Sequence, residues 1–164
     1  MFDFAPAADQ SQSWPKPQTW QELAEAARAV TLGESDGVAN MANVAALIWQ
    51  FVPNLNWAGF YRVVDGELVL GPFIGKPACI RIVFGKGVCG AAAASGQVQL
   101  VADVHAFPGH IACDADSRSE LVMPVLRGGR VIAVIDLDSP QPARFDAEDA
   151  AGIALLAAAI ADLI

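Results

Sequence analysis

The chain has 164 residues, of which 54% are hydrophobic and 17% are charged. The hydrophobic content excludes a disordered chain, and the length fits one domain with a sizeable core. The formal net charge is -8 and no basic cluster is present. This argues against binding to nucleic acid or to an anionic membrane surface, because both need lysine and arginine. We expect a small molecule or another protein as the partner.

Targeting signals are not evident in the sequence. The longest apolar run, residues 150–161, is too short to cross a bilayer, for which about 20 residues are needed. The first ten residues lack the basic and apolar regions of a secretory signal. We therefore expect a cytoplasmic protein with reduced cysteines, in which any disulfide is transient and either catalytic or sensing.

The N-terminal part is predicted to be an arm followed by a helix. Residues 1–18 are expected to be irregular, because Pro15 and Pro17 interrupt helices. The helix is predicted to begin at Thr19, where Thr-x-x-Glu resembles a capping box, and to end at Gly33. A second helix is predicted over about 36–51.

From Trp57 onward the pattern indicates strands. The dipeptides Asp65-Gly66 and Gly128-Gly129 are typical of tight hairpins. A short helix rich in small residues is expected over 88–94, and 103–118 is expected to be a polar loop. The expected strands are 57–64, 67–73, 80–84, 98–102, 120–126 and 131–137.

A last helix is predicted to begin after the cap Asp146 and to reach about Leu163. The order is thus two helices, a run of strands with one short helix, and a terminal helix. Hairpin connections imply an antiparallel sheet, and helices gathered at the chain ends favour an α+β sandwich. No internal repeat or linker is evident, so residues 19–164 are expected to form one domain.

Cys79, Cys89 and Cys113 contain no C-x-x-C pair. Their simplest interpretation is that they are buried and act as small hydrophobic side chains. Two features favour chemistry instead. Cys89 follows Gly-Lys-Gly at a predicted helix start, which favours a thiolate, and Cys113 lies on a polar loop. Zinc bound by His105, His110 and Cys113 is a less favoured alternative, because structural zinc sites usually show paired short spacings.

Asp136 and Asp138 alternate in Val-Ile-Asp-Leu-Asp, so a strand places both on one face. Glu120 begins the neighbouring predicted strand. Carboxylates that face one cavity raise at least one pKa among them, which provides a proton donor near neutral pH. A solvated face is the alternative. Trp57 and Tyr61 also share a face by their spacing, with ordinary core packing as the simpler interpretation.

Six segments carry a family resemblance: NWAGFY (56–61), LVLGPF (68–73), GKPACIRI (75–82), GKGVCGAAA (85–93), DVHAFPGHIACDADSRSE (103–120) and VIDLDSP (134–140). Together they resemble the free methionine-R-sulfoxide reductases, a GAF-domain family, over residues 20–163. All three cysteines match the cysteine motifs of the family at the same spacing. The resemblance implies a single α+β GAF domain with a six-stranded antiparallel sheet. The N- and C-terminal helices would cover one face, and the ligand pocket would lie on the other.

The resemblance also implies a reaction, the thiol-dependent reduction of free L-methionine-(R)-S-oxide to L-methionine. Cys113 is then the catalytic nucleophile, Cys79 the resolving cysteine and Cys89 an additional cysteine of recycling. Cys113 would pass through a sulfenic acid to an intramolecular disulfide, which thioredoxin reduces. The positions implied to bind the substrate are Trp57, Tyr61, Glu120, Asp136 and Asp138.

No metal and no cofactor are expected beyond an external thiol reductant, and the family alone suggests a homodimer. We expect the substrate carboxylate at the amides of the helix start, Gly87 to Gly90. Two residues depart from the family pattern: Ile74 in GPF-x-G and Asp116 in CDA-x-S. Asp116 adds a negative charge near Cys113, which disfavours its thiolate. A GAF domain that senses a small molecule without turnover, and a thiol sensor oxidised by peroxide, are the alternatives.

Overall fold

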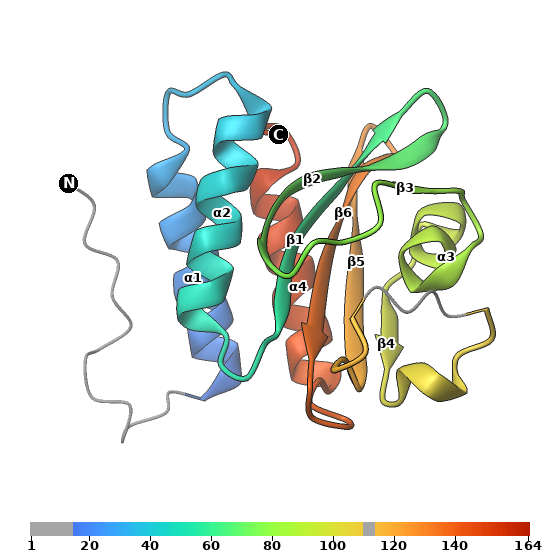
Figure 1. Ribbon diagram of the computed structural model, residues 1–164. Coiled ribbons are helices and arrows are strands. Elements are labelled where there is room, and N and C mark those ends of the chain that lie inside the picture. The colour runs from blue at the N-terminus through green and yellow to red at the C-terminus, as the bar shows by residue number, and fades with distance from the viewer. Residues whose placement is uncertain (1–14, 110–113) are drawn as a thin grey trace.

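The structure is a computed structural model that describes residues 15–109 and 114–164. It has three layers (Figure 1). Helices α1 (Lys16–Val30), α2 (Gly37–Phe51) and α4 (Ala147–Ile160) cover one face of the sheet, and the short helix α3 (Gly87–Ser95) lies on the other side. The predicted α+β class and the placement of the terminal helices on one face are confirmed.

The sheet has six strands in the order β3-β2-β1-β6-β5-β4, and every neighbouring pair is antiparallel. At the hairpin between β1 and β2, Asp65 and Gly66 both have positive φ (51° and 85°), as a tight turn of this kind requires. In the described part of the predicted polar loop there is a short 3-10 helix, η1 (Val104–Ala106). The strands are β1 (Trp57–Val64), β2 (Glu67–Gly75), β3 (Arg81–Ile82), β4 (Gln99–Val101), β5 (Ser119–Arg127) and β6 (Arg130–Ser139).

Helix α1 begins at Lys16, three residues before the predicted start. The capping box expected at Thr19 is therefore wrong, and the Thr19 hydroxyl instead donates to the Pro15 carbonyl at 3.4 Å. Proline lacks the backbone N–H that the first helical turn leaves unpaired, so Pro17 is accommodated in that turn rather than interrupting it. Residues 1–14 of the predicted arm lie outside the described residues.

The two ends of the described domain are joined by the buried carboxylate of Asp149, which is 1% exposed. Its Oδ1 accepts a hydrogen bond from the Trp20 indole at 3.1 Å. Its Oδ2 accepts from Lys16 Nζ at 2.6 Å and from Arg144 Nη1 at 3.2 Å. Asp149 also completes a capping box with Asp146 at the start of α4. This network fixes α1 against α4.

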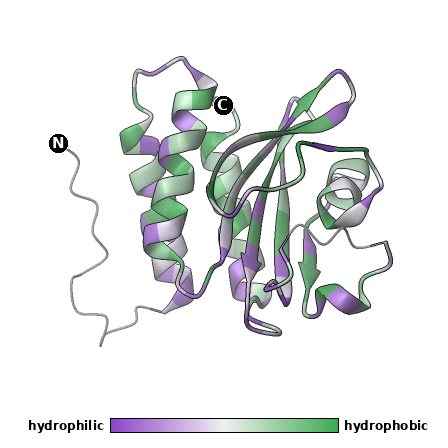
Figure 2. Ribbon diagram, viewed as in Figure 1, coloured by the Kyte–Doolittle hydropathy of each residue, from purple (hydrophilic) through white to green (hydrophobic). Residues whose placement is uncertain are grey.

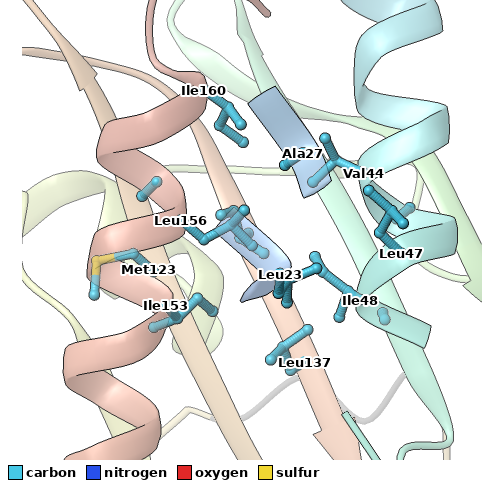
Figure 3. Close-up of a cluster of buried hydrophobic side chains, with 14 of the residues drawn as sticks. Leu23, Ala27, Val44, Leu47, Ile48, Met123, Leu137, Ile153, Leu156 and Ile160 are labelled. Atoms are coloured by element: carbon cyan, nitrogen blue, oxygen red, sulfur yellow. The ribbon is translucent and has the colours of Figure 1, made fainter. Parts of the chain in front are cut away.

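The main hydrophobic core lies between the helices and the sheet. Figure 3 shows side chains of α1, α2 and α4 converging on Met123 of β5 and Leu137 of β6. On β6, Ile135 and Leu137 belong to this core, so Asp136 and Asp138 point to the opposite face. Figure 2 shows such hydrophilic residues interrupting the otherwise hydrophobic central strands. No helix in the described part of the chain is both long and apolar enough to cross a membrane.

Candidate active site

A pocket opens on the α3 side of the sheet. The empty space at this pocket is about 550 Å³, a volume that includes open solvent at its mouth. Strands β1, β5 and β6 contribute residues to it, together with the segment 76–78, the start of α3, and Asp114 and Ser117. Cys89 lines the pocket with all five residues predicted to bind substrate, namely Trp57, Tyr61, Glu120, Asp136 and Asp138.

Strand register brings the carboxylates together. Asp138 on β6 lies opposite Trp57 on β1 and opposite Glu120 on β5. Asp136 lies one row further along, opposite Gly59. Because directly paired residues on neighbouring strands point to the same face, three acids converge beside one aromatic ring. The alternative of a solvated face is excluded for Glu120 and Asp136, since each is only 6% exposed.

Burial is the largest cause of the raised pKa values of these three carboxyl groups. It raises the pKa of Asp136 to about 6, although hydrogen bonds from Cys89 and Glu120 oppose the shift. Burial, and then the negative charges of Asp136 and Asp138, raise the pKa of Glu120 well above its usual range. Burial and the charge of Asp136 do the same to the pKa of Asp138. The cluster therefore retains a proton near neutral pH.

This arrangement predicts a pH-dependent stability. In the unfolded chain the three carboxyl groups ionise near pH 4, whereas the folded protein holds them protonated. The stabilisation is therefore complete below about pH 4 and is lost as pH rises through 6 and above. Ionised Asp136 alone lowers the free energy of unfolding by about 3 kcal/mol at neutral pH.

Urea denaturation between about pH 5 and 7.5 measures this loss. The free energy of unfolding of the wild-type protein should fall across that window. The fall should be smaller in Asp136→Asn, because the amide does not ionise. Glu25→Gln, which changes an exposed carboxylate on α1, is the matched control and should follow the wild type. A wild-type stability that is flat or rising across the window would contradict this account.

Cys89 is buried at the start of α3, with 4% of its surface exposed. Burial, followed by the negative charges of Asp136 and Glu120, raises the pKa of the Cys89 thiol well above its usual value. The predicted thiolate at this helix start is therefore wrong, because desolvation and neighbouring acids outweigh the helix dipole. At neutral pH Cys89 is a thiol that donates a hydrogen bond to Asp136.

Two aromatic side chains donate hydrogen bonds to the backbone of residues 76–79, the segment that carries Cys79. The Trp57 indole donates to the Lys76 carbonyl at 3.1 Å, and the Tyr61 hydroxyl donates to the Cys79 carbonyl at 3.0 Å. The two rings stack at 5.9 Å between centroids, and Trp57 also stacks on Phe73 at 5.2 Å. The predicted shared face of Trp57 and Tyr61 is confirmed, and both side chains also pack in the smaller hydrophobic cluster beneath α3.

Sequence reasoning missed Lys76. Its Nζ lies 3.1 Å from Asp114 Oδ1 and 2.5 Å from Asp116 Oδ2. The negative charge of Asp116 is therefore paired with Lys76, and the predicted effect of Asp116 on the Cys113 thiolate stays a prediction. The unusual Asp116 was the one sequence signal for this contact. Cys113 and His110 themselves lie outside the described residues.

The helix start offers fewer free amides than predicted. The Gly90 N–H donates to the Lys86 carbonyl at 3.0 Å, and the Gly90 carbonyl accepts from Gly85 N–H at 2.7 Å. A Cβ at Gly90 would meet the Val83 carbonyl oxygen at 2.5 Å, so this close packing requires glycine. The predicted anion site is thereby narrowed to Gly87, Val88 and Cys89, which line the pocket.

One group of side chains in the described residues could hold a metal ion. The ligand atoms of Cys89, Glu120 and Asp136 lie within 4.8 Å of one another. Hydrogen bonds from Cys89 and Glu120 to Asp136 account for the same arrangement without a metal. Of the residues in the zinc alternative, His105 has its Nε2 3.1 Å from Arg118 Nη1, and His110 and Cys113 lie outside the described residues.

The architecture and the pocket define a GAF domain, and the GAF domain family model matches residues 39–164. Protein YtsP of Bacillus subtilis is 51% identical over 142 residues, covering 85% of this chain and 87% of that protein. The free methionine-R-sulfoxide reductase of Escherichia coli is 47% identical over 143 residues, covering 87% of each. The solved structure of the free methionine-R-sulfoxide reductase from Neisseria meningitidis, in complex with its substrate, superimposes with a TM-score of 0.87. It is 43% identical and covers 92% of this chain and 90% of that one. The chain belongs to the free methionine-R-sulfoxide reductase family of GAF domains.

Proposed function

We propose that this protein is an oxidoreductase that reduces free L-methionine-(R)-S-oxide to L-methionine with electrons from a thiol. The observation that carries the proposal is the convergence of Glu120, Asp136 and Asp138 beside Trp57 in the lining of one pocket. Membership of the reductase family and the substrate complex of the Neisseria meningitidis relative support it.

The carboxylates bind the ammonium group of the free amino acid. Asp136 Oδ1 is buried and accepts no hydrogen bond from any described group, so it is available to a charged donor. Trp57 and Tyr61 enclose the S-methyl group, and a pocket shaped by rigid rings distinguishes the R from the S arrangement at sulfur. The substrate carboxylate faces the first turn of α3 at Gly87.

Cys113 is the nucleophile in this proposal. Its thiolate attacks the sulfoxide sulfur. The oxygen atom is transferred to the Cys113 sulfur, and the acid cluster supplies the proton that neutralises the charge on this oxygen. Methionine leaves, and Cys113 becomes a sulfenic acid. The Cys79 thiol then displaces the hydroxyl group as water and forms the Cys79–Cys113 disulfide. Cys89 has a secondary part in recycling, because its protonated thiol is a weak nucleophile.

Thioredoxin is the proposed reductant, and its dithiol restores both cysteines by exchange. This chemistry requires a reducing compartment, which fits a cytoplasmic location. We keep a homodimer as part of the proposal on the family resemblance, and sedimentation of the full chain measures it. Turnover coupled to thioredoxin, thioredoxin reductase and NADPH tests the reductant, and a protein that turns over only with dithiothreitol would contradict it.

The N-acetyl derivative of the substrate tests the carboxylate site. Acetylation removes the ammonium charge, so kcat/KM should fall by about 100-fold relative to the free amino acid, as expected for losing a charge-assisted contact to buried acids. Methionine or N-acetylmethionine release under dithiothreitol measures both values. Asp138→Asn should lower kcat/KM for the free amino acid more than for the derivative. Equal kcat/KM for the two compounds in the wild-type protein would contradict the proposed site.

A further inference from the structure

The acid cluster of the pocket, together with Cys89, fits a second kind of ligand. The ligand atoms of Cys89, Glu120 and Asp136 all lie within 4.8 Å of one another, so small side-chain rotations bring them to one metal ion at about 2.0–2.3 Å. We infer that these three side chains form a binding site for one zinc ion, which inhibits the proposed reaction by occupying the place of the substrate ammonium group. The inhibition rests on the proposed function and adds regulation to it, whereas the zinc site rests on the geometry of the pocket.

The three ligands lie on regular elements of the fold and not on loops. Glu120 of β5 pairs with Asp138 of β6, which is two residues along the same strand from Asp136. Glu120 and Asp136 are therefore diagonal neighbours on one face of the sheet, within reach of each other. Cys89 lies in the first turn of α3, which packs on both strands. A helix and two paired strands hold ligands more precisely than loops do, so the site is arranged before a metal binds.

One carboxylate oxygen in this group is suited to a cation. Asp136 is 6% exposed and lines the pocket, and its Oδ1 accepts no hydrogen bond from any described group. A buried carboxylate oxygen without a donor has lost its solvation by water, and a cation beside it compensates for that loss. In the proposed reaction this cation is the substrate ammonium group. A metal ion is another class of cation that reaches the same oxygen through the pocket mouth.

The donor atoms favour zinc over the hard divalent cations. A cysteine sulfur and two carboxylate oxygens form a mixed set, and thiolate ligands select zinc, whereas magnesium and calcium prefer oxygen ligands alone. Zinc in proteins is commonly four-coordinate, so three protein ligands leave one position for water from the pocket. The Cys89 thiol gives its proton to the solvent as the Zn–S bond forms. The thiolate and the two carboxylates each carry one negative charge, and the zinc ion neutralises two of the three.

Zinc and the substrate exclude each other from this part of the pocket. Zinc bound to Asp136 takes the carboxylate that the proposed function assigns to the ammonium group, and its positive charge repels that group. It also takes the place of the protons that the acid cluster supplies to the sulfoxide oxygen. The bound metal therefore stops both substrate binding and proton transfer, and a chelator that removes the metal restores them.

Cobalt binding to Cys79→Ser/Cys113→Ser tests the site without any catalysis. The chain has three cysteines, so Cys89 is the one thiol left in this variant. The probe is Co²⁺, which accepts the same ligands as zinc and whose bond to a thiolate gives a charge-transfer absorption in the near ultraviolet. We expect one Co²⁺ per chain with this absorption, release of the thiol proton, and loss of the absorption when Zn²⁺ is added. An excess of Mg²⁺ or Ca²⁺ should not displace the Co²⁺.

Further substitutions in the same background identify the ligands. Cys89→Ser should remove the absorption, and Asp136→Asn should weaken Co²⁺ binding by about 100-fold or more, since even the partners of metal ligands contribute about 10–100-fold. Asp138→Asn is the matched control, because it changes an acid of the same pocket that lies outside the group of three. It should weaken binding by less than about tenfold. Equal weakening by both aspartate substitutions, or no thiolate absorption in the folded parent variant, would overturn the inference.

Single-turnover methionine release measures the inhibition. The reduced protein is freed of reductant, because small thiols bind zinc, and is mixed with L-methionine-(R)-S-oxide at a series of Zn²⁺ concentrations. The zinc concentration that halves the wild-type rate should rise by about 100-fold in Cys89→Ser, and EDTA should restore the wild-type rate. Equal zinc sensitivity of the two proteins would overturn the inhibition through this site. A wild-type protein that releases no methionine without zinc would overturn the proposed function, whereas cobalt binding would still decide the metal site.

Discussion

Cys113→Ser should abolish multiple turnover of free L-methionine-(R)-S-oxide, with kcat lowered by about 10⁴-fold or more. A serine hydroxyl is far less nucleophilic than a thiolate and cannot accept the sulfoxide oxygen as a sulfenic acid. Cys79→Ser should behave differently. It should release about one methionine per chain and then stop, because the resolving thiol is missing and the buried, protonated Cys89 thiol is a weak nucleophile.

The measurement is methionine release with thioredoxin as the reductant, since small thiols at high concentration reduce a sulfenic acid directly and conceal the difference. Circular dichroism confirms that each variant is folded. Multiple turnover by Cys113→Ser would exclude Cys113 as the nucleophile. Sustained turnover by Cys79→Ser under thioredoxin would exclude the Cys79–Cys113 disulfide from the cycle.

Asp149→Ala should lower the free energy of unfolding by about 3–5 kcal/mol. The substitution leaves the Trp20 indole without its acceptor, removes the common partner of Lys16 and Arg144, and opens the capping box of α4. The effect is large because the Asp149 side chain is 1% exposed, so water does not replace the lost contacts readily.

Urea denaturation at one pH measures the effect, and Asp162→Asn is its control. The Asp162 side chain is 92% exposed and approaches Arg127 only to 4.0 Å, so its loss should change stability by less than about 0.5 kcal/mol. Asp149 lies in α4, on the helix side of the sheet, and does not line the pocket, so folded Asp149→Ala should keep the wild-type KM. A loss below about 1 kcal/mol would contradict the role assigned to this network.

Local pattern predicted much of the fold. The alternation in Val-Ile-Asp-Leu-Asp placed Asp136 and Asp138 on one face of β6, and the Asp65-Gly66 turn located the first hairpin. The start of α1 was predicted wrongly because two local signals compete there: Pro15 and Pro17 permit a helix to begin at Lys16, and the Thr-x-x-Glu pattern favours a later start. Only the packing of α1 on α4, through Lys16 and Asp149, decides between these two starts of the helix.

Predicting the site was harder, because its properties depend more on contacts between residues that are distant in sequence. Burial, followed by the charges of acids on β5 and β6, raises the pKa of the Cys89 thiol, and together they outweigh the local helix start on which the prediction rested. Lys76 was missed because its partners Asp114 and Asp116 are 38 and 40 residues away, and no spacing rule connects two loops. The pocket residues were found because strand period and family resemblance agree on the same positions.

The most direct test of the central claim uses L-methionine S-oxide as an equal mixture of the two epimers at sulfur, incubated to completion with the full-length protein and excess dithiothreitol. Chiral chromatography follows the methionine released and the sulfoxide that remains. We predict that methionine release stops when half of the sulfoxide is consumed and that the remaining half is the S epimer. No methionine release by the folded, reduced protein, or consumption of both epimers, would contradict the assignment of this pocket to free L-methionine-(R)-S-oxide.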